Sequence, residues 1–150
     1  MNIDNDICFD ILWPKEEQIK ENVLNNNSIV CKMRYKSVSM LFTGDIEKIA
    51  ETQILDEYKY NLEMLRATML KVGHHGSKTS SREEFIKAVE PKISLIGVGE
   101  NNNFGHPNGE VIQRLESIGA KIYRTDKMGE ITLIIDNKGK IKVKRFINEK

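Results

Sequence analysis

Two of the three histidines of the chain stand side by side in the segment Gly73-His74-His75-Gly76, directly after the short apolar run 69–72. The flanking glycines remove side-chain bulk, so these imidazoles have little reason to pack in a core. Imidazole nitrogen is a preferred ligand for borderline metals such as zinc, manganese and iron. The pair therefore predicts metal or phosphate chemistry on a loop that follows a strand.

A carboxylate occupies a similar position earlier in the chain. The tripeptide Thr43-Gly44-Asp45 follows the apolar pair Leu41-Phe42, and Gly44 allows the backbone to turn closely. Asp45 then lies at the end of the expected strand, where α/β folds often place their sites. The alternative is that Asp45 caps the helix that follows it.

Two further loops carry residues that could do chemistry. His106 lies between the strand that ends near Val98 and the helix that begins near Asn108, so it either belongs to the beginning of that helix or reaches a metal or substrate. Arg124 follows another strand and either binds a phosphate or pairs with Asp126. We favour the salt bridge for Arg124 and leave both roles open for His106.

The serine-rich segment after the histidine pair has a structural interpretation. Ser80 and Glu83 show the S-x-x-E spacing of a capping box, in which the serine and the glutamate satisfy backbone N–H groups at the start of a helix. This favours a helix that begins near Arg82 over a nucleophilic role for Ser80.

The elements that must position these loops follow from the spacing of apolar residues. Alternation predicts antiparallel strands in the first third of the chain, and strands and helices alternate afterwards. Strands are expected at about 7–11, 29–35, 39–42, 68–72, 93–98, 121–123, 131–135 and 140–147, and helices at 46–54, 82–89 and 111–118. We expect an α/β (α+β) fold, a mixed sheet with helices on one face, and a hairpin turn at 137–139.

Composition excludes several classes of protein. The 150 residues are 39% hydrophobic and 30% charged, with 23 Lys plus Arg against 22 Asp plus Glu, so neither disorder nor an overall field for nucleic acid or lipid is expected. No run reaches the roughly 18 apolar residues of a membrane helix, and the acidic beginning is unlike a secretory signal. We expect a cytoplasmic protein without a membrane segment. Cys8 and Cys31 lack the spacing of a metal site and are expected to be buried core residues.

Several segments together resemble the metallo-β-lactamase-fold domain of ComEC-type (DNA internalisation competence) proteins. They are FDILWP, NNNSIV, LFTGD, LKVGHHGSKTSS, NNNFGHPNGEVIQRL and YRTDKMGEI, in an order that matches over nearly the whole chain. The resemblance implies an αββα sandwich and a metal-dependent hydrolase of the phosphodiester or nucleic-acid type. Two divalent metals, zinc or manganese, would be bound at one edge. A β-lactam hydrolase is disfavoured because the loops resemble the competence branch.

The same resemblance assigns roles to residues. Asp45 matches the carboxylate that bridges the metals, and His75 or His74 matches the late histidine ligand, with His75 preferred and His74 left to hydrogen-bond the substrate or a ligand. These three would carry catalysis. Contact with an anionic substrate is implied for further motif positions: Ser77, Lys78 and His106, with Arg124 as an additional candidate.

The departure from the family is the absence of an HxHxDH or HxDxDH loop. Residues 1–150 are therefore expected to be a single partial domain, the C-terminal half of the sandwich, which binds metal weakly and is inactive alone. A separate chain with the missing half, or a second copy docked on the exposed sheet face, is the expected partner. The alternative is a non-catalytic domain that binds a partner or nucleic acid through its loops and the basic end 138–145.

Overall fold

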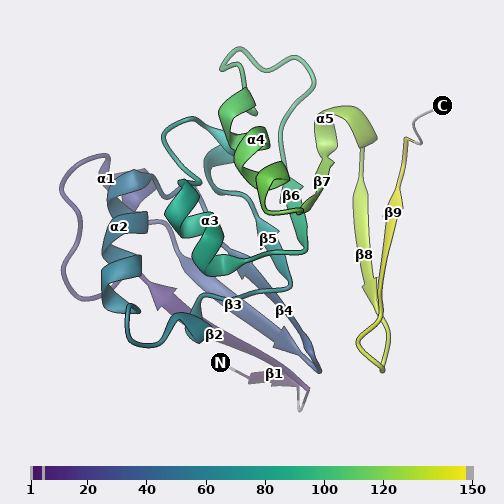
Figure 1. The fold of residues 1–150 in the computed structure, drawn as a ribbon, viewed down its shortest axis with the longest axis horizontal. Coiled ribbons are helices and arrows are strands. Elements are labelled where there is room, and N and C mark those ends of the chain that lie inside the picture. The colour runs from purple at the N-terminus through teal and green to yellow at the C-terminus, as the bar shows by residue number, and fades with distance from the viewer. Residues whose placement is uncertain (1, 5, 148–150) are drawn as a thin grey trace.

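Seven strands form one mixed sheet in the order in which they occur in the sequence (Figure 1). The computed structural model describes residues 2–4 and 6–147. The first four strands are antiparallel, and the last three continue parallel to β4. The strands are β1 (Asn2–Asp4), β2 (Ile7–Trp13), β3 (Val30–Tyr35), β4 (Val38–Phe42), β5 (Met69–Lys71), β6 (Ile93–Ile96) and β7 (Lys121–Arg124).

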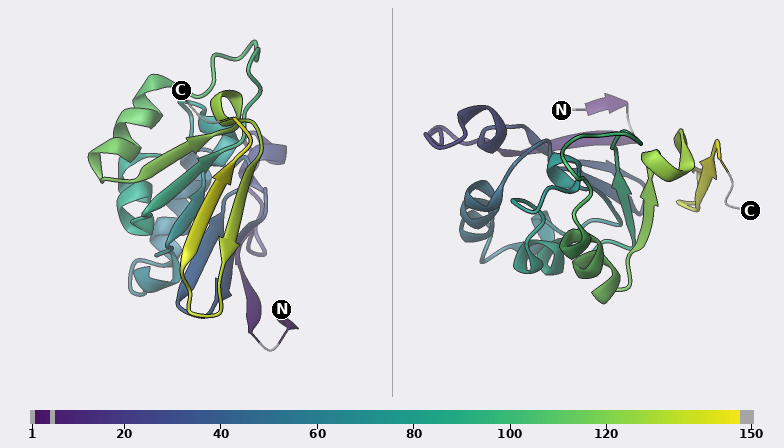
Figure 2. Two further views of the ribbon diagram at one scale, coloured as in Figure 1. Left: turned by 90° about the vertical axis from the view of Figure 1, so that its right-hand side faces the viewer. Right: turned by 90° about the horizontal axis from the view of Figure 1, so that it is seen from above.

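Three helices connect the parallel strands, and all of them cover the same face of the sheet (Figures 1 and 2). They are α2 (Lys48–Glu57), α3 (Glu83–Val89) and α4 (Gly109–Ser117). Parallel neighbours need such crossovers, which bury an apolar stripe of each helix against the strands. The resulting core joins strand residues Leu41, Leu70 and Ile96 to helix residues Ile54, Phe85 and Leu115.

A separate two-stranded hairpin, β8 (Ile131–Ile135) and β9 (Ile141–Arg145), lies on the other face. Its Leu133, Ile135 and Ile141 pack against a second cluster built on Val38, Met40 and Met69. Figure 2 (left) shows the hairpin standing in front of the sheet. The predicted strands and turn are confirmed, but these strands do not join the mixed sheet.

The hairpin changes one expectation about this second face. Part of the face is buried by the hairpin, so it is not exposed along its whole width. The β2 side is more open, and Ile11 there is 58% exposed. The same face carries Cys31, while Cys8 lies on β2. Both cysteines are free and half-buried, so the prediction that they are buried core residues is wrong.

The predicted fold class is confirmed, with differences at the ends of elements. The helix predicted from residue 46 begins at Lys48, and the strand predicted to reach Val98 ends at Ile96. The short elements were not predicted, because three or four residues are too few to show a periodic pattern of apolar side chains. They are β1, α1 (Val23–Asn26), η1 (Leu62–Met64), η2 (Gly73–Gly76) and α5 (Thr125–Met128). Within residues 2–4 and 6–147, no helix has the length and apolar character needed to cross a membrane.

Candidate functional site

The ends of β4, β5 and β6 lie at one edge of the sheet because the three strands are parallel. The loops that follow them meet there and bring Asp45 to His75, with Oδ1 of the carboxylate 3.8 Å from Nε2 of the imidazole. Asp45 does not cap α2, which begins at Lys48 and has no side-chain cap bond. The capping alternative for Asp45 is therefore wrong.

The backbone of the histidine loop is strained. His74 and His75 both have positive φ angles, 47° and 55°. Non-glycine residues rarely adopt this left-handed region, and two in succession carry a cost of order 1–3 kcal/mol each. Such strain persists where the surroundings hold the residues in place, and it is concentrated at functional sites.

His75 is oriented by a backbone carbonyl. Its Nδ1 lies 2.7 Å from the carbonyl oxygen of Gly97. A carbonyl only accepts, so Nδ1 carries the proton in this contact, and Nε2 is the ring nitrogen that lies 3.8 Å from Asp45. Metal-binding histidines are held in this way, with one ring nitrogen donating to a backbone carbonyl and the other free for the ion.

All three histidines of the chain gather at this edge. The ring of His74 lies 5.9 Å from that of His106 and 6.5 Å from that of His75, measured between centroids. Burial lowers the pKa of His106, and the neighbouring histidines lower it further. Phe104, which is 81% exposed, stacks on His106 at 5.8 Å.

The beginning of α4 is capped by Asn108 and not by His106. Oδ1 of Asn108 accepts a hydrogen bond from the N–H of Glu110.

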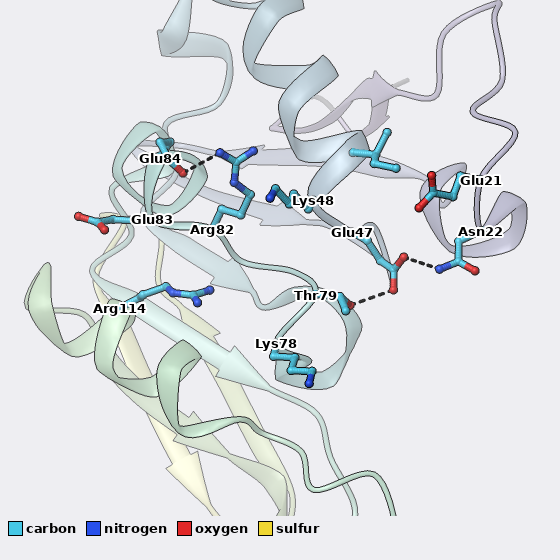
Figure 3. A pocket seen from close by; sticks show the side chains of 11 residues that line it. Glu21, Asn22, Glu47, Lys48, Lys78, Thr79, Arg82, Glu83, Glu84 and Arg114 are labelled. Carbon is cyan, nitrogen blue, oxygen red and sulfur yellow. Dashed lines mark hydrogen bonds and ion pairs between the residues drawn. The ribbon is translucent and has the colours of Figure 1, made fainter.

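Glu47 supports His74 and was missed by sequence reasoning. The buried Nδ1 of His74 lies 3.4 Å from Oε1 of Glu47 but has no partner in hydrogen-bond geometry. Glu47 accepts hydrogen bonds from Asn22 Nδ2 at 2.7 Å and Thr79 Oγ1 at 2.9 Å (Figure 3). Burial acts to raise the pKa of Glu47, but these bonds outweigh it and hold the pKa below its usual value. The only sequence signal was its position two residues after Asp45.

A cavity of about 570 Å³ opens beside this glutamate on the helical side. Lys78 lines it, together with Lys48, Arg82 and Arg114 (Figure 3). Ser77, by contrast, is 5% exposed, and its hydroxyl is within hydrogen-bond distance of Thr79 Oγ1. The structure thus places Lys78 on an open surface and Ser77 inside the loop.

Glu51 of α2 fixes the segment that follows the histidines. This carboxylate is 1% exposed and accepts hydrogen bonds from the backbone N–H groups of Ser81 and Arg82. Burial raises its pKa to about 7. The predicted capping box is therefore wrong: Ser80 donates to the Gly73 and Ser77 carbonyls, and a carboxylate distant in sequence satisfies the N–H groups before α3.

Arg124 forms an ion pair with Asp126. Its guanidinium makes a two-pronged contact with Asp126, with Nε to Oδ1 at 3.1 Å and Nη2 to Oδ2 at 2.6 Å. The hydrogen bond from Arg124 lowers the pKa of Asp126. The favoured salt bridge is confirmed.

Asp45 and His75 offer oxygen and nitrogen donors to a divalent ion. Their 3.8 Å separation suits an ion bound to both at the usual distances of about 2.0–2.2 Å. The donor chemistry fits zinc or manganese. Among the residues that the structure describes, no group of three or more His, Cys, Asp and Glu side chains is arranged to hold a metal.

Comparisons with known proteins agree with this architecture. The sequence model of the metallo-beta-lactamase superfamily matches residues 11–100. ComE operon protein 3 of Bacillus subtilis is 37% identical over 126 residues, which cover 84% of this chain and 16% of the relative. Competence protein ComA of Neisseria gonorrhoeae is 31% identical over 140 residues, 93% of this chain and 19% of the relative.

Recombination protein 2 of Haemophilus influenzae is 29% identical over 123 residues, which cover 82% of this chain and 15% of the relative. The chain spans less than a fifth of the length of each of these relatives. The resemblance inferred from the loop motifs is confirmed. The chain belongs to the metallo-beta-lactamase superfamily and is related to its ComEC-type competence proteins.

Proposed function

We propose that this chain supplies part of the metal centre of a hydrolase that cleaves phosphodiesters, with nucleic acid as its substrate class. The observation that best supports this proposal is the contact between His75 Nδ1 and the Gly97 carbonyl, which turns Nε2 toward Asp45. A histidine that only packed on the surface would need neither this orientation nor its left-handed backbone. Both features are expected of a metal ligand.

Asp45 and His75 would hold the metal, and two bound divalent ions would lower the pKa of a water and polarise the phosphoryl group. The remaining residues would act around that centre. His74, held beside Glu47, would hydrogen-bond the substrate or a ligand. Lys78, which lines the cavity, and His106, whose ring lies edge-on to that of His74, would contact the anionic leaving group.

We further propose that residues 1–150 are a partial domain. Two donors are fewer than the three protein ligands that a hydrolytic zinc site takes for each ion. The missing ligands would come from an HxDxDH loop carried by another polypeptide segment. The competing candidate is a module that binds nucleic acid without cleaving it. It is favoured by the exposed Lys142 and Lys144 on β9.

Metal binding by the full chain tests the first part of the proposal. Co²⁺ stands in for zinc and gives an absorption spectrum that depends on its ligands. We expect weak binding that is lost in Asp45→Asn and kept in Asp56→Asn, whose exposed carboxylate lies on α2. A Co²⁺ spectrum that is the same in both variants would remove Asp45 from the site.

Hydrolysis tests the second part of the proposal, that residues 1–150 are a partial domain. We expect no hydrolysis of DNA by this chain alone and Mn²⁺-dependent hydrolysis when it is co-expressed with a segment that carries HxDxDH. The same mixture with His75→Ala should be inactive. Association of the two chains without any hydrolysis would favour the binding module instead.

A further inference from the structure

Lys71 is a charged side chain on an otherwise apolar row of the sheet. In the register of the parallel strands it lies between Phe42 of β4 and Leu95 of β6, and its side chain therefore shares their face. Phe42 and Leu95 both pack against the cluster under the hairpin. A lysine whose side chain starts among such neighbours loses part of its hydration, which is unfavourable unless the ammonium finds a partner.

The ammonium of Lys71 is directed toward the candidate site. A Cβ placed on Gly97 would lie 3.4 Å from Cε and 3.9 Å from Nζ of Lys71, so the end of the side chain lies against this glycine. Gly97 is the residue whose carbonyl accepts from His75. Lys71 thus reaches the site from the face opposite the helices, whereas Lys78 lines the cavity on the helical side.

The partners that the structure gives this ammonium are few. Nζ donates to the carbonyl of Val72 at 3.0 Å, which uses one of its three N–H groups. Among the described residues no carboxylate lies within ion-pair distance of it, although the charge of Asp45 acts on it. Burial lowers the pKa of Lys71, and the nearby Asp45 raises it by less. The group is therefore a partly buried cation near a carboxylate with which it forms no ion pair.

A cation at this position opposes a metal ion bound to Asp45 and His75, because like charges repel. It becomes favourable when an anion is bound between them, since a metal and an ammonium together surround a phosphoryl oxygen from two sides. We propose that the ammonium of Lys71 binds the phosphoryl group of the substrate at the Asp45–His75 site. This inference rests on the proposed function.

The test measures binding, so it does not depend on turnover. The full chain is titrated with thymidine 5′-monophosphate by calorimetry, with and without Co²⁺, and thymidine serves as the probe without a phosphate. The variants are Lys71→Met, Lys71→Arg and the control Lys121→Met, which removes an exposed lysine from the far end of β7. We expect Lys71→Met to weaken nucleotide binding about tenfold, because one charge-assisted hydrogen bond is lost.

Lys71→Arg keeps the charge and should stay within about threefold of the original affinity, and Lys121→Met should bind as the original chain does. Lys71→Met should bind Co²⁺ at least as tightly as the original chain. Methionine suits the apolar neighbours, and Lys71→Gln replaces it if circular dichroism shows misfolding.

Equal nucleotide affinity in Lys71→Met and the original chain would overturn the inference, and so would binding that does not require the phosphate. A Co²⁺ spectrum that is unchanged in Asp45→Asn would instead contradict the proposed metal centre. The titrations without Co²⁺ still measure the contribution of Lys71 in that case.

Discussion

Nε2 of His75 lies 3.8 Å from Oδ1 of Asp45, and the Gly97 carbonyl holds the imidazole in that direction. Three strand ends cooperate in this arrangement, because Asp45 follows β4, His75 follows β5 and Gly97 follows β6. The adjacent His74 is turned toward Glu47 instead. The two histidines of the pair therefore have different environments and should differ in their effect on a metal.

The first prediction separates the two histidines. His75→Ala should weaken Co²⁺ binding more than about 100-fold, whereas loss of a group outside the ligand set changes metal affinity by about 10- to 100-fold, so His74→Ala should have the smaller effect. Calorimetric titration of each variant measures this. A larger loss in His74→Ala than in His75→Ala would assign the ligand to His74.

The second prediction concerns Glu51, whose pKa rises from 4.5 to about 7 because it is buried. Below pH 4.5 the carboxyl is protonated in the folded and unfolded states alike. Between pH 4.5 and about 7 only the unfolded chain releases the proton, so the free energy of unfolding falls as pH rises. At 1.36 kcal/mol for each pKa unit, the fall is on the order of 3 kcal/mol.

Glu51→Gln resembles the protonated side chain and should remove this contribution. Urea unfolding from pH 5 to 8 should show the variant gaining stability relative to the original chain as pH rises. Glu116→Gln, an exposed change on α4, should follow the original curve. Parallel curves for Glu51→Gln and the original chain would show that Glu51 is charged throughout.

The third prediction tests whether Arg124 serves the fold. Its hydrogen bonds lower the pKa of Asp126, so the pair stabilises the folded state above the usual pKa of 3.8, and the contribution is lost as pH falls below it. Arg124→Met should lower the free energy of unfolding by roughly 1–2 kcal/mol at pH 7 and by less at pH 3. Nucleotide binding should not change. Unchanged stability together with weaker nucleotide binding would support the phosphate-binding role instead.

Predictions from the sequence succeeded where a pattern extends over several residues. Alternating apolar residues located β2 to β4, and the helical spacing of apolar residues over 46–54 located α2, because burial on one face imposes those periods. The histidine pair was recognised as a candidate site because its flanking glycines remove side-chain bulk, so packing in a core does not explain two adjacent imidazoles. Parallel strand ends then brought its loop to Asp45, as the topology requires.

Contacts between distant segments could not be predicted in the same way. Glu51 and Ser80 are both ordinary in the sequence, and only the packing of α2 against the segment before α3 decides which of them satisfies the free N–H groups. The role of Glu47 was likewise identified only from the hydrogen bonds that it accepts from Asn22 and Thr79. The hairpin was predicted as strands, but its position depends on side chains of β4 and β5 that alternation alone does not distinguish.

The last prediction concerns the open part of the second sheet face. Ile11 of β2 is 58% exposed and lies in register with Cys31 of β3, which shares a face with the cluster under the hairpin. Burying such a side chain contributes about 1.5–3 kcal/mol, so a partner that covers this face would gain affinity from it. We expect Ile11→Lys to weaken both self-association and binding of a segment that carries HxDxDH. Leu24→Lys, a change on α1 at a side chain that is 90% exposed, is the matched control. Sedimentation velocity over a range of concentrations measures both kinds of association, and equal association constants for the two variants would place the contact elsewhere.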